Sequence, residues 1–244
     1  MSRWSINRFR GLVLSVWCCS LFFSAELRAQ DTANLAESAR ADYGLENFDW
    51  NGLSQFAEIA RAEGIELKLS AELDYDQLDP EQPLLMIHPQ QPVAVANLSN
   101  FIVAGGRALL ADDFGASDAL LERLGITRMV MPPANLPHTD FVDDNPALPI
   151  FTPAGRHPLL HGVEQLVANH PAILFNVGLP VVSFSENGGL VYDMSLGEGK
   201  VIVLADPSLL INNMLLVADN AVFARNALLY LCGDISPCKK RQAS

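Results

Sequence analysis

The sequence predicts an α/β domain whose sheet is mostly parallel and carries a short antiparallel addition. Three observations support this fold class. From residue 51 to residue 125, segments with helical spacing of apolar residues alternate with short apolar runs, as expected of βαβ units. The run from Val201 to Leu204 is apolar throughout, which is typical of a strand buried on both faces. Asn187 and Gly188 separate two short apolar segments and favour a hairpin turn, because both tolerate positive φ.

The first half of the chain supplies the alternation of helices and strands. Each predicted helix is followed within two residues by a glycine, which commonly ends a helix. The first predicted strand alternates apolar with charged residues, so we expect it near an edge of the sheet with one face in water. Helices are predicted for residues 51–63, 93–103 and 119–124, and strands for residues 65–69, 84–87 and 107–111.

The second half is less regular. Residues 132–158 are rich in Pro, Asn and Asp and predict a long excursion from the sheet. Residues 197–231 predict a strand, a polar loop and a helix. Pro207 ends this strand because it has no N–H to donate, and Asp219 or Asn220 is expected to cap the helix. Further short strands are predicted for residues 129–131, 172–175, 181–184 and 190–192.

Residues 1–29 have the order of a secretory signal peptide. Arginines come first, an apolar segment follows at residues 11–23, and small residues precede the expected cleavage after Ala29. We therefore expect an exported protein, periplasmic or extracellular, in which residues 30–244 form a single domain with a short C-terminal tail. The apolar segment is short for a membrane-spanning helix, and an uncleaved N-terminal anchor is the alternative.

The chain is strongly acidic. It contains 16 Lys and Arg against 28 Asp and Glu, a formal charge of −12. Such a protein is poorly suited to nucleic acid, because duplex affinity depends on Lys and Arg at phosphates, and poorly suited to anionic lipid. Acidity also simply keeps a protein soluble. We expect no nucleic-acid partner, and membrane contact only through an uncleaved N-terminal anchor.

Two cysteines remain beyond the predicted signal peptide. Cys232 and Cys238 lie just past the last predicted helix, separated by five residues. In an oxidising compartment they would form a disulfide bond that closes the C-terminal tail. Two free thiols are the alternative, whereas a metal site is disfavoured because no histidine is nearby.

Polar residues follow the predicted parallel strands. His88 follows the strand at 84–87, Asp112 and Asp113 follow the next strand, and Asp206 follows the strand at 201–204. Because open α/β sheets bind ligands at the carboxyl ends of their strands, we expect a ligand-binding crevice there, which could also hold a divalent cation. Over a cation site or acid–base chemistry, the favoured interpretation is that the aspartates cap the following helices and His88 packs against Pro89. The candidate crevice residues are His88, Asp112, Asp113, Asp206, Ser208, Asn213, Asp219 and Asn220.

A second histidine pair has the spacing of metal ligands on a helix. His157 and His161 are four residues apart, which would place them on one helical face. Pro158 follows His157 directly and disfavours helical geometry at that position. A zinc pair is therefore the less favoured interpretation, and no metal or cofactor is expected.

Several motifs together resemble a known bacterial family. Phe101-Ile-Val-Ala-Gly-Gly-Arg-Ala-Leu-Leu-Ala-Asp-Asp resembles the helix-to-strand step of the class I glutamine amidotransferase-like fold. The motifs similar to domain-of-unknown-function family 4350 are His157-Pro-Leu-Leu-His-Gly-Val, Asn169-His-Pro, Gly197-Glu-Gly-Lys-Val-Ile-Val-Leu-Ala-Asp-Pro-Ser and Asp219-Asn-Ala. The resemblance to this family covers residues 42–231 and implies a three-layer sandwich with a flavodoxin-like sheet. It implies no reaction, but the frequent proximity of family members to MoxR-type ATPase genes hints at envelope assembly.

No complete set of catalytic residues accompanies this resemblance. Glutamine amidotransferases need a nucleophilic Cys, and none lies between Cys19 and Cys232; a Gly-x-Ser-x-Gly elbow is also absent. We therefore expect a non-catalytic binding or scaffold domain with a protein partner in the cell envelope, accessory to an assembly or transport system. One alternative is a metal-dependent envelope hydrolase that uses His88, Asp112 and Asp206. The other is a structural subunit that docks through residues 132–158.

Overall fold

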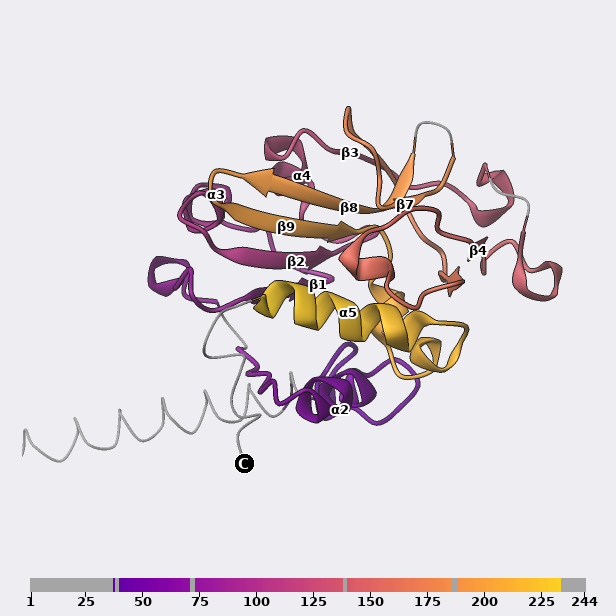
Figure 1. Ribbon diagram of the computed structural model, residues 1–244, viewed down its shortest axis with the longest axis horizontal. Coiled ribbons are helices and arrows are strands. Elements are labelled where there is room, and N and C mark those ends of the chain that lie inside the picture. Colours follow the sequence, from indigo (N-terminus) through magenta and orange to yellow (C-terminus); the bar gives the residue numbers. More distant parts are fainter. Residues whose placement is uncertain (1–36, 38–39, 71–72, 138–139, 186–187, 234–244) are drawn as a thin grey trace, which may run out of the picture.

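A mixed seven-stranded sheet forms the centre of the protein (Figure 1). The computed structural model describes residues 37, 40–70, 73–137, 140–185 and 188–233. The strand order is β1-β2-β9-β8-β6-β3, and β7 also pairs with β8. The strands are β1 (Leu84–Ile87), β2 (Arg107–Ala111), β3 (Thr127–Met129), β6 (Ile173–Phe175), β7 (Val182–Ser183), β8 (Gly189–Leu196) and β9 (Gly199–Leu204).

The prediction of a mostly parallel, flavodoxin-like sheet in a three-layer sandwich is wrong. Only β1 with β2 and β2 with β9 pair in parallel. The pairings of β9 with β8, β8 with β6, β6 with β3 and β7 with β8 are antiparallel. The sheet is therefore mixed and mostly antiparallel.

The connection between β8 and β9 explains this difference. Gly197 and Glu198 alone join the two strands, and a connection of two residues makes the strands antiparallel neighbours. Gly197 has φ of 62°, and a Cβ there would lie 2.7 Å from the Val103 carbonyl oxygen, so the turn requires glycine. Sequence analysis limited this strand to residues 190–192, whereas β8 continues to Leu196 and pairs with β9 along its whole length.

Helices pack on the sheet and on one another. α5 (Asn220–Cys232) runs along the sheet, and α2 (Ser54–Ala62) packs on the outer side of α5, as Figure 1 shows. α3 (Val95–Val103) packs against β8 and β9, and α4 (Asp118–Arg123) packs against β3. Within the described residues, no helix combines the length and the apolar character needed to cross a membrane.

The central strands are buried on both faces. Adjacent residues Leu109 and Leu110 of β2 are 1% and 0% exposed, and adjacent residues Ile202 and Val203 of β9 are equally inaccessible. Because successive side chains of a strand point to opposite faces, both faces must be covered. This matches the apolar runs of these strands and confirms the prediction that residues 201–204 form a strand buried on both faces.

Most predicted helices and strands are confirmed, but one strand prediction fails and the bounds of another are shifted. Residues 65–70 form no strand, although Ile65 is buried, because no neighbouring strand pairs with them. The strand predicted at 129–131 begins two residues earlier, as β3. The long excursion contains short 3₁₀ turns and β4 (Ile150–Phe151), which pairs with β5 (Leu166–Val167) in a separate two-stranded sheet.

Three predictions lie wholly or partly outside the described residues. They are the signal peptide at residues 1–29, the Asn187 half of the predicted hairpin turn, and Cys238. Cys232, at the end of α5, is disulfide-bonded. Its pairing with Cys238 stays a prediction.

Candidate functional site

Four predicted site residues converge at one edge of the sheet. His88 follows β1, Asp112 and Asp113 follow β2, and Asp206 follows β9, and these three parallel strands end at the same edge. The Nδ1 atom of His88 lies 3.3 Å from Asp113 Oδ1 and 3.6 Å from Asp112 Oδ1. Asp206 is close enough to Asp113 for their charges to interact. We call these four residues the carboxyl-edge cluster.

Asp112 binds groups of its own chain. Its carboxylate accepts hydrogen bonds from Gly115 N at 2.6 Å and from Ser117 N at 3.2 Å, and from the Ser117 hydroxyl. The Arg128 guanidinium lies 2.7 Å from Asp112 Oδ2, and both side chains are buried. This carboxylate therefore holds the loop after β2 and neutralises a buried arginine.

Asp206 is also bonded to backbone groups. Its carboxylate accepts hydrogen bonds from Asn169 N at 2.6 Å and Ser208 N at 2.8 Å. The side chain is fully buried, and this burial raises the pKa of Asp206 to about 7. Burial likewise raises the pKa of Asp113, while neighbouring His88 opposes that shift. The cluster thus contains two carboxyl groups that are harder to ionise than ordinary aspartates.

His88 has a strained backbone and an unsatisfied ring nitrogen. Its φ is 47°, a left-handed value that non-glycine residues rarely adopt. The ring lies between Tyr43 and Phe114, with centroid separations of 5.4 and 5.1 Å. Among the described residues, the buried Nδ1 atom has no hydrogen-bond partner, although two carboxylates lie close to it. Burial raises the pKa of Tyr43 to about 12, so this phenol stays protonated beside the cluster.

The other predicted crevice residues contact different parts of the chain. Ser208 adjoins the cluster, and its side chain hydrogen-bonds Tyr43. The Asn213 backbone N–H donates to Trp50 O at 3.2 Å. Asp219 occupies the N-cap position of α5 but makes no side-chain bond to the helix.

Asp219 and Asn220 hold the segment before β5 and β5 itself. The Asp219 carboxylate accepts from Glu164 N at 2.8 Å and Gln165 N at 3.0 Å, and these bonds lower its pKa. Asn220 is fully buried; it accepts from Val167 N and donates to Val167 O. The two residues expected to cap α5 therefore join the start of this helix to the segment at residues 164–167.

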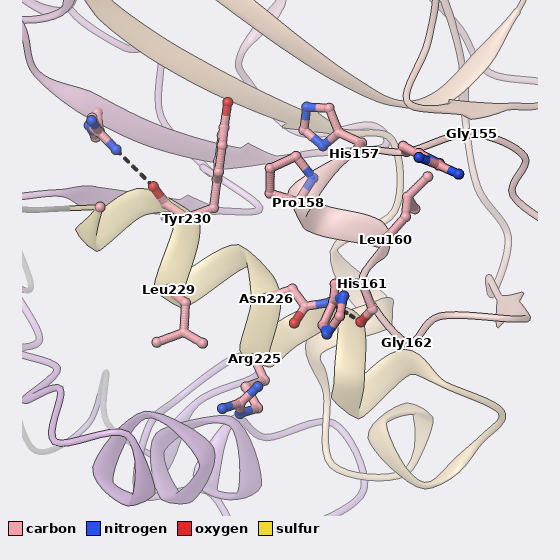
Figure 2. A pocket seen from close by; sticks show the side chains of 13 residues that line it. Gly155, His157, Pro158, Leu160, His161, Gly162, Arg225, Asn226, Leu229 and Tyr230 are labelled. Carbon is pink, nitrogen blue, oxygen red and sulfur yellow. Dashed lines mark hydrogen bonds between the residues drawn. The ribbon is translucent and has the colours of Figure 1, made fainter.

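A large pocket lies away from the carboxyl-edge cluster, between α5 and the loop that contains residues 155–162 (Figure 2). Its volume is about 940 Å³, at the upper end of the range for small-molecule sites. We call it the basic pocket. The lining residues are Arg107, Gly155, Arg156, His157, Pro158, Leu160, His161, Gly162, Arg225, Asn226, Leu229, Tyr230 and Gly233.

Two hydrogen-bonded anchors shape the basic pocket. Asn226 of α5 donates to Leu159 O at 3.1 Å and to His161 O at 2.8 Å, which fixes the loop to the helix (Figure 2). Arg107 of β2 donates to Tyr230 O at 2.9 Å, near the C-terminus of α5, where a cation is favoured by the helix dipole. The pocket wall is therefore built from three separate segments held by specific contacts.

The acidic groups near this pocket are already paired. Asp193 of β8 accepts from the Tyr230 hydroxyl at 2.5 Å, and lies 3.3 Å from His157 Nε2 and 3.7 Å from Lys200 Nζ. Glu63, after α2, pairs with the Nε atom of Arg225. Asp193 Oδ2 and Glu63 Oε1 are therefore committed to neighbouring groups, whereas the buried Asp193 Oδ1 has no hydrogen-bond partner among the described residues.

Two pocket side chains that can carry a positive charge and donate hydrogen bonds have no partner among the described residues. Within the part of the chain that the structure describes, Arg156 and the His161 imidazole make no hydrogen bond or ion pair. Both residues are exposed. These donors are available to a ligand.

Sequence analysis missed the basic pocket. It considered His157 and His161 only as a metal pair, and the structure places both in the pocket wall, with His157 directly before a 3₁₀ turn. Arg107 and Arg225 reach the pocket from β2 and α5, more than a hundred residues apart. The available signal was the small number of basic residues in an acidic chain, two of which, Arg156 and His157, stand together just before Pro158 in the predicted excursion.

Comparison with known proteins gives one family match. The family described as "Domain of unknown function (DUF4350)" matches residues 46–229. Curated proteins give no match. Among solved structures, the mmIFT52 N-terminal domain is similar over 74% of this chain and 90% of that chain, with a TM-score of 0.57 and 16% identity. That likeness shows a shared fold alone.

Two glycoside hydrolase structures show weaker likeness. The exo-β-1,4-mannosidase Op5Man5 from Opitutaceae bacterium strain TAV5 has a TM-score of 0.46 and 11% identity over 74% of this chain. The β-galactosidase from Rahnella sp. R3 has a TM-score of 0.46 and 15% identity over 72% of this chain. The chain spans 30% and 26% of these two enzymes, and their activities carry no argument here.

Proposed function

The chain belongs to the DUF4350 family, and because the description of that family names no activity, we propose a function from the geometry of the protein. The protein is an exported, non-catalytic binding domain, accessory to a cell-envelope assembly or transport system. It takes its ligand in the basic pocket. The observation that carries this proposal is the pocket itself, a volume of about 940 Å³ whose wall includes donors without a partner in the described part of the chain.

The chemistry of the carboxyl-edge cluster supports a non-catalytic role. Asp112 and Asp206 accept hydrogen bonds from backbone N–H groups, and Asp112 also pairs with buried Arg128. Groups held in this way position the loops that they bind, which is a structural role. The sequence also has no Cys between Cys19 and Cys232, so the proposal includes no cysteine-dependent amidotransferase reaction.

Equilibrium dialysis of the purified protein against a small-molecule extract of the bacterial envelope tests this proposal. Mass spectrometry would identify compounds that the protein retains and any that it converts. We expect retention of an unchanged compound, and loss of retention in Leu229→Trp, which fills the pocket from an exposed position of α5 without changing charge. Conversion of a retained compound, or equal retention by the variant, would contradict the proposal.

Export has its own test. The full-length chain and a form lacking residues 2–29 can be expressed with a C-terminal tag and located by cell fractionation. We expect the full-length chain outside the cytoplasm with residues 1–29 removed, as N-terminal sequencing would show. A cytoplasmic full-length chain that retains residues 1–29 would refute export.

A second candidate function is a metal-dependent envelope hydrolase, and one observation favours it. The buried Nδ1 atom of His88 lies between two carboxylate oxygens, at 3.3 and 3.6 Å, without a hydrogen bond to either. Atoms with this spacing can share a cation, since two ligands of a tetrahedral zinc ion lie about 3.3 Å apart. The positive charge of Arg128, 2.7 Å from Asp112, opposes such an ion, and we therefore rank this function second.

Metal content decides between the two functions at this cluster. A stoichiometric divalent ion in the purified protein, or a rise in melting temperature with added ion that His88→Gln abolishes, would establish the cation site. His157→Gln is the matched control, since that imidazole also lies beside a carboxylate but outside the cluster. No bound metal and no rise in melting temperature would refute the hydrolase function.

A further inference from the structure

The charge of the basic pocket is opposite to the charge of the protein. The chain carries −12 overall, yet none of the 13 described residues that line the pocket is an Asp or Glu. The lining includes Arg107, Arg156 and Arg225, together with His157 and His161. A concentration of cationic side chains in a concave site of an acidic protein favours an anionic ligand.

The donors of these side chains are only partly used inside the protein. Arg107 uses one nitrogen, Nη1, on the Tyr230 carbonyl oxygen, and Arg225 uses Nε on Glu63. Across the described residues, Arg156 and the His161 ring have no partner at all. Guanidinium groups bind carboxylate and phosphate oxygens in bidentate geometry, and charge-assisted bonds of this kind are the stronger ones.

The remaining lining is apolar or aromatic. Pro158, Leu160 and Leu229 contribute carbon surface, and the Tyr230 ring lies at the end of the pocket near His157 (Figure 2). In the view of Figure 2, Arg225 lies at the opposite end from Tyr230. A ligand complementary to both the cationic and the apolar parts of the lining combines an anionic group with an apolar or planar body.

We propose that the basic pocket binds a small molecule bearing a phosphate or carboxylate group, held by Arg156, Arg225 and His161. This inference rests on the proposed function, because it names the class of ligand for the same pocket. Arg107 and Asn226 shape the site through their bonds to Tyr230 O and the loop carbonyl oxygens. Pro158, Leu229 and Tyr230 accommodate the body of the ligand.

Titration calorimetry with two simple anions tests the inference. Pyrophosphate and citrate are the probes, and trehalose is an uncharged control. We expect one of the anions to bind and trehalose not to bind. Arg156→Gln and Arg225→Gln should each weaken binding about tenfold, because a charge-assisted hydrogen bond contributes about 1.4 kcal/mol or more. The double variant Arg156→Gln/Arg225→Gln should abolish measurable binding, whereas Arg123→Gln, an exposed arginine of α4 outside the pocket, should bind normally.

The outcomes separate this inference from the proposed function. Binding of pyrophosphate alone assigns a phosphate ligand, and binding of citrate alone assigns a carboxylate ligand. Binding that persists in the double variant, or no binding of either anion, overturns the anionic-ligand inference. If the protein still retains an unchanged neutral compound that Leu229→Trp excludes, the binding function stands and only the ligand class is wrong.

Discussion

The carboxyl-edge cluster and the basic pocket use their polar groups in opposite ways. At the cluster, the carboxylates of Asp112 and Asp206 are buried and accept hydrogen bonds from backbone N–H groups, those of Gly115 and Asn169 among them. In the pocket, Arg156 is exposed, and among the described residues it has no partner. A polar group that the fold has already satisfied stabilises the fold, whereas an unsatisfied exposed donor is available for recognition. Substitutions at the first region should therefore change stability, and substitutions at the second should change binding.

The largest stability effect is expected from Asp112→Ala. This change leaves the buried Arg128 guanidinium without its buried carboxylate and removes the acceptor for Gly115 and Ser117. Breaking a buried ion pair typically costs about 3–5 kcal/mol of unfolding free energy. Urea unfolding followed by circular dichroism measures the loss.

Asp118 provides a matched control for that experiment. It also pairs with Arg128, but its side chain is 79% exposed. Exposed ion pairs contribute about 0–1 kcal/mol, so Asp118→Ala should barely change the unfolding midpoint. Similar losses in the two variants would mean that burial of Asp112 does not determine its contribution.

A pH dependence of stability is expected next, from Asp206. Its folded-state pKa of about 7 exceeds the ordinary value of 3.8, so the folded state retains a proton that the unfolded chain releases. The contribution of Asp206 is therefore fully present below about pH 4 and is lost as pH rises towards 7. The difference amounts to roughly 4 kcal/mol when each pKa unit is taken as about 1.4 kcal/mol.

Unfolding free energies of the wild type and Asp206→Asn between pH 4 and pH 8 measure this effect. Carboxyl groups away from the cluster, including Asp219 with its lowered pKa, contribute to both proteins alike. The wild type should therefore lose stability relative to the variant as pH rises. Parallel pH profiles for the two proteins would show that Asp206 is ionised in the folded state throughout this range.

A moderate effect on both stability and binding is expected at Asn226. Its amide donates to the carbonyl oxygens of Leu159 and His161, so Asn226→Ala leaves both acceptors without this donor. We expect a loss of about 1–3 kcal/mol in unfolding free energy and weaker binding in the basic pocket. Asn176→Ala is the matched control, since Asn176 also donates to two carbonyl oxygens, of Leu124 and Gly125, outside the pocket. Equal losses of binding in both variants would argue that the hydrogen bonds from Asn226 to the loop do not shape the binding site.

Local sequence patterns predicted the elements better than their arrangement. Apolar runs located β1, β2 and β9, and helical spacing located α2, α3 and α5, because burial of side chains leaves a pattern within each segment. Strand direction has no such pattern. Here it depended on the two-residue turn at Gly197 and Glu198, which makes β8 antiparallel to β9. The alternation at residues 65–69 failed for a related reason, since a strand also needs a partner.

The two candidate sites also differed in how far the sequence could predict them. His88, Asp112, Asp113 and Asp206 could be grouped from sequence because each is the first or second residue after a strand, and strands that run parallel end together. The basic pocket joins β2, the loop at 155–162 and α5, and the contacts that join them come from tertiary packing. No spacing rule connects Arg107 with Arg225, so only the structure could bring them together.

The smallest stability effect is expected in the basic pocket, and it sharpens the comparison most directly. Arg156→Gln removes an exposed charge that has no partner among the described residues, so the unfolding free energy should change by less than about 0.5 kcal/mol. Arg123→Gln, which removes the same charge elsewhere, should have an equally small effect. Thermal melts at low and moderate salt measure both variants. A loss above about 1 kcal/mol for Arg156→Gln alone would show that this arginine is needed for the fold, and the unpaired donor could then no longer be attributed to ligand recognition.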